Sequence, residues 1–347
     1  MKIVKGDLIQ SEAEALVNTI NTVGVMGKGI ALQFRQAFPE EYYKNYQKAC
    51  QNDEVKIGQM HVFETGKLTN PRFIINFPTK KHWRGKSKIE DIKAGLQDLI
   101  NVVQKKHIKS IAIPPLGCGN GGLLWSEVRP LIEMSFAELP DVEVLLFAPD
   151  GAPNAEAMKI ATKRPGWTVV RASLISLFEI YLLPGYRLSM LEAQKLAYFL
   201  QSSGEPLELS FTKDKYGPYT ETLHHVLQRM EGHFLRGYGD RSLKAIEPTM
   251  MLTPKAASEA ECYLRDYSRE TVARLESVSR LIEGFEYPHG MELLATVHWV
   301  ANEYEEAKNN LEKNIEAVHA WSERKKTQFS EREIEIAWKR LKECCYI

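Results

Sequence analysis

The chain has 347 residues with 45 Lys and Arg against 45 Asp and Glu, so its formal net charge at pH 7 is zero. Hydrophobic residues make up 44% and charged residues 26%, which excludes disordered, collagen-like and disulfide-scaffold proteins and, at roughly 100–200 residues per domain, indicates two domains. No apolar run approaches the roughly 18 residues that span a bilayer and the start does not read as a signal peptide, so we expect a cytoplasmic protein without a membrane contact.

Residues 1–163 alternate short β-branched runs with longer helical stretches, which is the pattern of an α/β fold. We predict strands at 2–4, 15–17, 59–63, 72–76, 110–113 and 142–147, and helices at 30–38, 41–50, 87–106, 126–139 and 155–163. The first domain should therefore end at residue 163, just before Pro165-Gly166.

Residues 164–347 form a mainly helical second domain in this prediction, with helices at 190–202, 219–229, 254–283, 291–320 and 331–343. In the stretch 213–219 we expect a turn, with Pro218 as the first residue of the following helix. Residues 256–316, which we call the acidic segment, hold 13 acidic against 6 basic side chains. This segment is either a surface for a DNA-binding partner or a solubilising face with arginine partners one turn away.

Three glycine-bearing stretches of the first domain carry the functional signal. They are Gly6-Asp7-Leu8-Ile9, the loop from Asn21 to Gly27-Lys28-Gly29 and the loop Gly117-Cys118-Gly119-Asn120-Gly121-Gly122-Leu123. Glycines between a strand and a helix let backbone N–H groups approach a phosphate, and the helix N-terminus adds favourable partial charge. Neither long loop has the spacing of a Walker A or Rossmann motif, which disfavours ATPase and dehydrogenase functions.

Together these motifs resemble the macrodomain family, whose members are three-layer α/β/α domains around a mixed sheet that bind ADP-ribose. The resemblance covers about residues 1–160. The stretch 75–84 and the helical second domain further resemble the DarG family of antitoxins. That resemblance implies removal of ADP-ribose from thymidine bases in single-stranded DNA, with the DarT-type toxin that attaches it as a protein partner of residues 164–347.

The macrodomain resemblance also implies roles for individual residues. Asp7 and Leu8 would hold the adenine, and Phe147 would lie near it. The loop residues Gly117, Cys118, Gly119, Asn120, Gly121, Gly122 and Leu123 would wrap the diphosphate, and Asn21, Gly27, Lys28 and Gly29 would enclose the distal ribose. No cofactor is implied, and the five cysteines lack the spacing of zinc ligands, so we expect no metal.

The DarG resemblance assigns catalysis to Lys80, with Asn21 at the ribose. In the basic run that follows, Lys81, Trp83 and Arg84 are candidate DNA contacts, because cations neutralise phosphates and an indole can stack on a base. The alternative is a solvated loop before the next helix. Related glycohydrolases have an acid where this chain has Gly121, which keeps open ADP-ribose binding without turnover. Hydrolysis of ADP-ribosyl esters on proteins is a second alternative.

Overall fold

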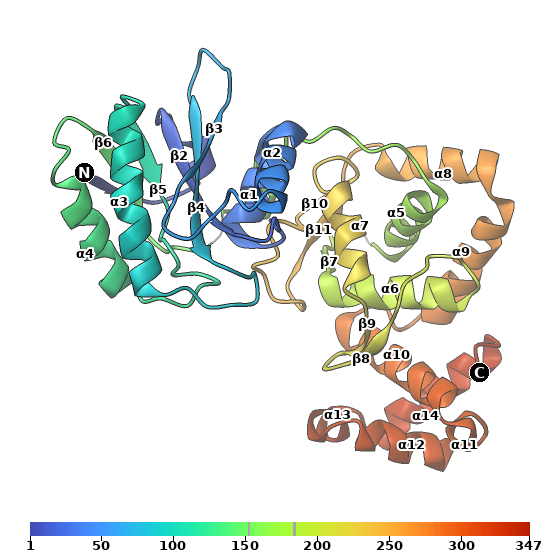
Figure 1. The fold of residues 1–347 in the computed structure, drawn as a ribbon. Helices are drawn as coiled ribbons and strands as arrows, with labels where there is room; N and C mark the ends of the chain where they lie inside the picture. The colour runs from blue at the N-terminus through green and yellow to red at the C-terminus, as the bar shows by residue number, and fades with distance from the viewer. Residues whose placement is uncertain (152, 183–184) are drawn as a thin grey trace. The chain divides into compact units, whose positions relative to one another are not determined.

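The structure is a computed structural model that describes residues 1–151, 153–182 and 185–347. The chain divides into two compact units (Figure 1). The first unit comprises Met1–Lys163 with the short segment Gly239–Ser242, and the second comprises Arg164–Tyr238 with Leu243–Ile347.

The first unit is built on one six-stranded mixed sheet. Its strand order is β1 (Lys2–Val4), β6 (Glu143–Phe147), β5 (Ser110–Ile113), β2 (Ala15–Asn21), β4 (Phe73–Lys80) and β3 (His61–Glu64). Neighbouring strands are parallel except β3, which pairs antiparallel with β4. The carboxyl ends of the parallel strands therefore meet at one edge of the sheet, where ligands of open α/β sheets bind.

Helices cover both faces of this sheet, as Figure 1 shows. The helices α3 (Ile89–Lys105) and α4 (Trp125–Phe136) share a core with Ala15 and Val17 of β2. On the other face α1 (Gly29–Ala37) and α2 (Glu40–Gln51) pack with Leu16 and Ile20 of the same strand. The side chains of β2 thus alternate between two buried layers, as the pleat requires. This confirms the three-layer macrodomain architecture.

Three elements of the first unit differ from the prediction. Strands β2 and β4 are longer than expected and end at Asn21 and Lys80. The predicted helix 155–163 was wrong, because only the 3₁₀ turn η2 (Ala155–Ala157) forms there, and η1 (Leu8–Gln10) is a second such turn. The Asn154 side chain caps η2 by accepting from the Glu156 N–H at 3.0 Å, and the backbone returns to an extended conformation at Met158, which is buried.

The second unit is mainly helical, as predicted. Its helices are α5 (Val169–Tyr181), α6 (Met190–Ser202), α7 (Thr222–Met230), α8 (Ala256–Tyr267), α9 (Arg269–Ile282), α10 (Pro288–Glu303), α11 (Glu305–Asn309), α12 (Leu311–Ala320), α13 (Glu323–Gln328) and α14 (Glu331–Glu343). Three short strands, β10 (Leu235–Arg236), β11 (Pro248–Leu252) and β7 (Leu188–Ser189), form one sheet, and β8 (Thr212–Asp214) and β9 (Gly217–Tyr219) form a hairpin.

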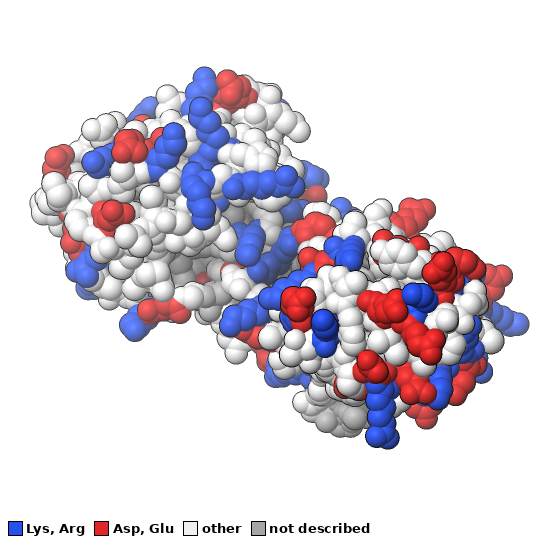
Figure 2. All heavy atoms as spheres, turned by 90° about the horizontal axis from the view of Figure 1, so that it is seen from below, with Lys and Arg blue, Asp and Glu red and all other residues white. Residues whose placement is uncertain are grey.

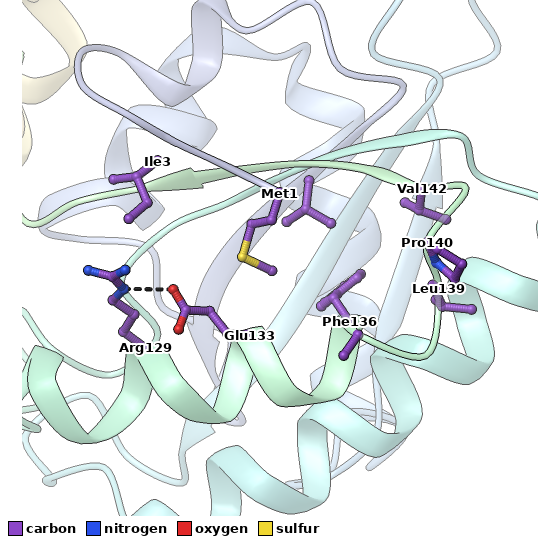
Figure 3. A pocket seen from close by; sticks show the side chains of 10 residues that line it. Met1, Ile3, Arg129, Glu133, Phe136, Leu139, Pro140 and Val142 are labelled. Carbon is purple, nitrogen blue, oxygen red and sulfur yellow. Dashed lines mark hydrogen bonds and ion pairs between the residues drawn. The ribbon is translucent and has the colours of Figure 1, made fainter.

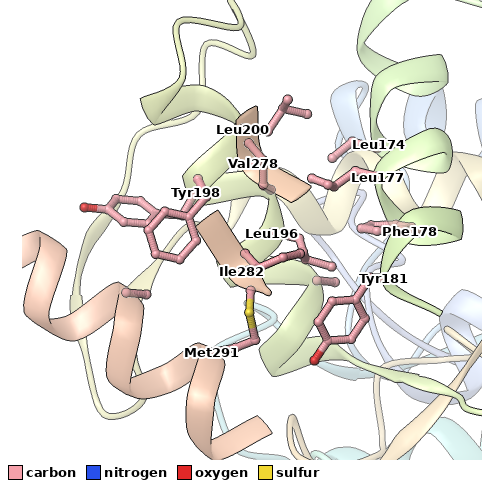
Figure 4. Close-up of a cluster of buried hydrophobic side chains, with 14 of the residues drawn as sticks. Leu174, Leu177, Phe178, Tyr181, Leu196, Tyr198, Leu200, Val278, Ile282 and Met291 are labelled. Carbon is pink, nitrogen blue, oxygen red and sulfur yellow. The ribbon is translucent and has the colours of Figure 1, made fainter. Parts of the chain in front are cut away.

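A large apolar core holds these helices together. Figure 4 shows Leu174 and Phe178 of α5 beside Leu196 of α6 and Ile282 of α9. Helix α6 is buried along almost its whole length, from Leu191 to Leu200. No helix in the described ranges is long and apolar enough to cross a membrane.

Four details of the second unit correct the sequence prediction. Helix α5 was missed, because it is apolar on most sides and so shows little helical periodicity. The predicted helix 254–283 breaks at Ser268, where φ is −157°. The predicted helix 291–320 breaks at Tyr304 and at Asn310, whose side chain caps α12 by accepting from the Lys313 N–H at 3.0 Å. Pro218 lies in β9 rather than at the start of a helix.

Candidate active site

The predicted catalytic residues end two adjacent strands of the sheet. Asn21 at the end of β2 is in register with Lys80 at the end of β4. The two following loops are tied together, because the Thr22 N–H and hydroxyl both donate to the carbonyl oxygen of Lys81, at 3.1 and 3.0 Å. The structure therefore brings the loops after β2 and β4 to one point of the sheet edge.

Lys80 reaches from β4 to the third glycine-bearing stretch. Its Nζ donates to the carbonyl oxygen of Asn120 at 3.1 Å, while Lys81 is exposed. Partial burial lowers the pKa of the Lys80 amine, and the ammonium of Lys86 lowers this pKa further. A lysine with a lowered pKa holds its proton less tightly, so its amine is available as a nucleophile or base at a more neutral pH.

The glycine loop Gly117–Gly122 has a backbone suited to an anion. The described residues offer no hydrogen-bond acceptor to the N–H groups of Gly119, Asn120 and Gly121. The loop is closed by the Leu123 N–H, which donates to the carbonyl oxygen of Gly117 at 3.0 Å. Successive N–H groups in such a turn make a concave site for phosphate oxygens.

Gly121 leaves no room for a side chain. A Cβ at this position would lie 2.3 Å from the carbonyl oxygen of Gly117 and 2.3 Å from the Ser87 hydroxyl, whereas a Cβ at Gly119 would meet nothing within 4 Å. The acid that related glycohydrolases have at this position therefore cannot fit here without a change in the loop. The chemistry of this site must be arranged without it.

Asn21 organises its own loop. Its Nδ2 donates to the carbonyl oxygen of Val25 at 2.6 Å, and its Oδ1 accepts from the N–H groups of Val23 and Val25 and from the Tyr46 hydroxyl. The side chain is 5% exposed. Asn21 thus fixes the loop that leads to Gly27, exposed Lys28 and Gly29, and a Cβ at Gly29 would lie 3.0 Å from the Asn120 side-chain nitrogen. The two glycine loops face one another.

The residues predicted to hold adenine lie near the end of the first strand. The Asp7 carboxylate accepts from the Ile9 N–H at 2.9 Å and from the Gln10 side chain at 3.0 Å. Leu8 is buried, and Phe147 at the end of β6 is buried in the same apolar core. Asp7 therefore lies at the same sheet edge as the glycine loops, while Phe147 contributes to packing.

The basic residues after β4 form a structured loop. Arg84 lies over the Trp83 ring at 4.5 Å, and the His82 ring packs against Trp83 with 5.2 Å between centroids. The Trp83 side chain nevertheless remains 45% exposed. On the face drawn in Figure 2, Lys and Arg side chains gather on the first unit, whereas acidic and basic side chains intermingle over the second.

Sequence reasoning missed three residues at this site. Lys86 runs along Gly122, Ser87 lies under the glycine loop with its N–H donating to the carbonyl oxygen of Gly121 at 3.0 Å, and Tyr46 donates to Asn21. Only Lys86 carried a signal, because it belongs to the basic run. The other two come from α2 and from the start of α3, so only the fold brings them here.

A cavity of about 430 Å³ lies elsewhere on the first unit, between β1, β6 and α4 (Figure 3). Met1, Ile3 and Phe136 give it an apolar lining, and the ion pair between Arg129 and Glu133, 2.7 Å long, borders it. None of the predicted site residues lines it. The described residues also contain no group of three or more His, Cys, Asp or Glu side chains placed to hold a metal ion.

Known proteins are similar to this chain in sequence. Residues 17–132 match the Macro domain family. The chain is 45% identical over 339 residues to the DNA ADP-ribosyl glycohydrolase of Thermus aquaticus, covering 97% of this chain and 91% of the relative. It is 35% identical over 164 residues to a DNA ADP-ribosyl transferase-DNA ADP-ribosyl glycohydrolase fusion protein of Thermosipho africanus, covering 43% of this chain and 42% of that one.

Among solved structures, the macrodomain of Mycobacterium tuberculosis DarG is 52% identical, with a TM-score of 0.42 over 43% of this chain and 99% of that chain. The identity to the Thermus relative extends over nearly the whole of both chains, first and second unit alike. This chain therefore belongs to the DNA ADP-ribosyl glycohydrolase family.

Proposed function

We propose that this chain is an antitoxin enzyme that hydrolyses the N-glycosidic bond between ADP-ribose and a thymidine base in single-stranded DNA. The observation that carries the proposal is the position of the Lys80 amine, 3.1 Å from the carbonyl oxygen of Asn120. Asn120 belongs to the glycine loop, in which three N–H groups have no acceptor among the described residues. The names of the full-length relative and of the fusion protein support the reaction class. ADP-ribose is then the product that leaves the site.

In this proposal the substrate lies along the carboxyl edge of the sheet. The adenine amine donates to Asp7, whose carboxylate oxygens can each accept more than one hydrogen bond, and the Leu8 N–H donates to the ring. The diphosphate lies on the loop from Gly117 to Leu123, which includes Cys118. The distal ribose lies between Asn21 and the segment from Gly27 to Gly29, next to Lys80.

The reaction breaks the bond between the anomeric carbon of the distal ribose and the thymine nitrogen. As a nucleophile, the Lys80 amine would bond to this carbon while the electron pair of the broken bond leaves with the thymine, which takes a proton from water. A water molecule would then displace the amine and complete the hydrolysis. As an ammonium, Lys80 would instead stabilise the leaving base while water attacks directly. The lowered pKa of Lys80 favours the first route.

DNA binding is assigned to the loop after β4. Lys81 and Arg84 supply cations for backbone phosphates, and the exposed part of Trp83 offers a surface on which a base can stack. Arg84 already covers one face of the indole, so the opposite face is the one available to a base. The loop directly follows Lys80, so in this proposal these contacts lie beside the reacting bond.

The test is hydrolysis of a single-stranded oligonucleotide that carries ADP-ribose on thymidine, by the full chain and by Lys80→Ala. Lys88→Ala serves as the control, because Lys88 is an exposed lysine at the start of α3. We expect the full chain and the control to release ADP-ribose and the Lys80 variant to bind it without turnover. Binding by all three proteins without any release would instead identify a protein that binds ADP-ribose without turnover.

Hydrolysis of ADP-ribosyl esters on proteins is the second candidate. The two substrates differ in their dependence on salt. A DNA substrate that neutralises several cations binds much more weakly as the salt concentration rises, whereas an ester on a small peptide does not. Competition between the two substrates at 50 and 200 mM salt separates these functions.

We propose further that residues 164–347 bind and inhibit the DarT-type toxin. The fusion protein supports this pairing, because its name joins a DNA ADP-ribosyl transferase and a glycohydrolase in one polypeptide. The acidic segment 256–316 supplies carboxylates that would complement the basic surface of an enzyme that binds DNA. Some of its carboxylates are instead paired within the unit, as Glu261 is with Arg265 at 2.8 Å.

Charge reversal in the full chain tests this proposal. We expect Glu276, Glu305 and Glu312→Lys together to weaken binding to the cognate transferase by at least tenfold while hydrolysis is retained. Glu323, Glu331 and Glu343→Lys make the same change in net charge outside the segment. If both triple variants bind the transferase like the unaltered chain, the acidic segment is a solubilising surface and not the interface.

A further inference from the structure

Two lysine side chains converge on one side of the glycine loop. The Lys80 Nζ donates to the Asn120 carbonyl oxygen at 3.1 Å, and the Lys86 chain runs along Gly122 two residues further on. The Lys86 Nζ, Cδ and Cε atoms lie 3.1, 3.3 and 3.6 Å from the position that a Cβ would take at Gly122. Because Gly122 has no side chain, the lysine stem can lie directly on the loop backbone.

The backbone holds Lys86 in this place. The N–H of the next residue, Ser87, donates to the carbonyl oxygen of Gly121 at 3.0 Å, so the loop after β4 and the glycine loop are joined at this point. Gly122 has φ of +82°, a conformation that favours glycine. Lys86 is therefore placed by two fixed segments of chain rather than by its own side-chain contacts.

No carboxylate balances the two amines. Within the part of the chain that the structure describes, neither Lys80 nor Lys86 forms an ion pair. The other titratable or charged groups on the loops 22–28, 81–88 and 117–122 are Lys28, Lys81, His82, Arg84, Lys88 and Cys118. Two like charges on one loop oppose each other's protonation, and the more buried of the two gives up its proton first.

We infer that Lys86 is a positioning residue of the reaction, whose ammonium on Gly122 adds to the effect of burial and disfavours protonation of the Lys80 amine. The inference deepens the proposed function and rests on it for the role of Lys80. Lys86 is exposed, and the proton that Lys80 loses goes to solvent. The lone pair left on the Lys80 Nζ is the one that attacks the anomeric carbon.

The experiment measures the protonation of Lys80 directly, without substrate. The full chain, Lys86→Met, Lys86→Arg and Lys88→Met are acetylated with acetic anhydride over a range of pH, and the modification of Lys80 is followed by mass spectrometry. In Lys86→Met the Lys80 titration should move upward by roughly half a pH unit, about a threefold loss of reactivity below the midpoint. Lys86→Arg keeps the charge and Lys88→Met leaves Lys86 in place, so neither variant should shift the titration of Lys80.

The pH profile of hydrolysis should shift in the same direction and by the same amount in Lys86→Met. An unchanged Lys80 titration in Lys86→Met would overturn the inference, and a loss of ADP-ribose affinity at an unchanged titration would make Lys86 a phosphate contact instead. If the proposed function is wrong, a different result is expected. In that case the unaltered chain releases no ADP-ribose from the oligonucleotide, while the acetylation experiment still reports the coupling of the two lysines.

Discussion

Asn21 and Lys80 lie opposite one another at the ends of the adjacent parallel strands β2 and β4. The register shifts just before this pair, since Ile20 pairs with Pro78 and Asn21 pairs with Lys80. The irregularity leaves Thr79 outside the residue pairing, although its hydroxyl donates to the Ile20 carbonyl oxygen at 3.3 Å. The Lys80 side chain, one residue further on, contacts Asn120. Strands β2 and β4 thus position both the Asn21 amide, which holds the loop after β2, and the Lys80 amine, which contacts the glycine loop.

A side chain at Gly121 should weaken ADP-ribose binding strongly, whereas one at Gly166, outside the site, should not. Gly121→Ala places a Cβ 2.3 Å from both the Gly117 carbonyl oxygen and the Ser87 hydroxyl, so the loop has to move. Overpacking of this kind costs about 1–3 kcal/mol of stability. We expect at least a tenfold loss of ADP-ribose affinity by calorimetry. Gly166→Ala, where a Cβ meets nothing within 4 Å and the residue lies outside the site, is the matched control, and equal affinities for both variants would contradict the prediction.

Replacing Asn21 should loosen the loop that leads to Gly29. Asn21→Ala removes one bond donated to Val25 and the bonds accepted from Val23, Val25 and Tyr46. Leaving buried polar groups unpaired costs roughly 1–3 kcal/mol, which urea unfolding of the full chain measures. Asn52→Ala, which removes an exposed amide bonded to Glu54, should change the stability little. If Asn21→Ala is as stable as the unaltered chain, the loop does not depend on this side chain.

Trp83 should contribute to DNA binding but not to ADP-ribose binding. Base stacking on an aromatic side chain contributes about 1–3 kcal/mol, so Trp83→Ala should weaken binding of an ADP-ribosylated oligonucleotide by roughly tenfold. Fluorescence anisotropy with the oligonucleotide and calorimetry with ADP-ribose separate the two effects. Tyr267→Ala removes a 70% exposed aromatic ring of the second unit and is the control. Parallel losses for both ligands would place Trp83 in the ADP-ribose site instead.

Stability should depend on pH through a buried lysine of the second unit. Lys195 is 1% exposed and its Nζ donates to the Pro218 carbonyl oxygen at 2.6 Å. Burial lowers its pKa to about 7 from the usual 10.5. Between these values the unfolded chain binds a proton that the folded chain does not, so this residue makes stability rise as the pH increases from about 7 toward 10.5.

Lys195→Met removes this contribution. The gain in unfolding free energy between pH 7 and pH 9.5, on the order of a few kcal/mol for a shift of this size, should become smaller in the variant. Urea unfolding at the two pH values measures it. Lys339→Met, which removes an exposed lysine paired with Glu335, should keep the pH dependence of the unaltered chain. Identical pH dependence in both variants would show that Lys195 titrates normally.

The sequence predicted the elements that have a strong local signal. The helix with apolar residues at 92, 96, 99, 100 and 103 was found because only one of its faces is buried. Helix α5 was missed because burial on most sides removes that periodicity. The break at Asn310 has a local cause, because the Asn310 side chain caps α12 by accepting from the Lys313 N–H.

The candidate site shows the same division between local and long-range information. Gly117 and Gly119 could be singled out in the sequence, because glycine-rich loops between a strand and a helix are visible in a single sequence, and Lys80 was singled out through the DarG resemblance. Three contacts could not be predicted: Ser87 under the loop, Lys86 on Gly122 and the Tyr46 hydroxyl on Asn21. Each of these contacts joins elements that are separate in the chain, so no local pattern records it.

The sequence by itself determined the two-domain α/β and helical organisation and the motifs that show the family, because hydrophobic periodicity and glycine spacing are properties of neighbouring residues. The tertiary structure alone decided that Asn21 holds its loop, that no acid fits at Gly121 and that the side chains of Lys80 and Lys86 both contact the glycine loop. The physical reason is that burial, steric exclusion and charge coupling depend on distances between side chains far apart in the chain.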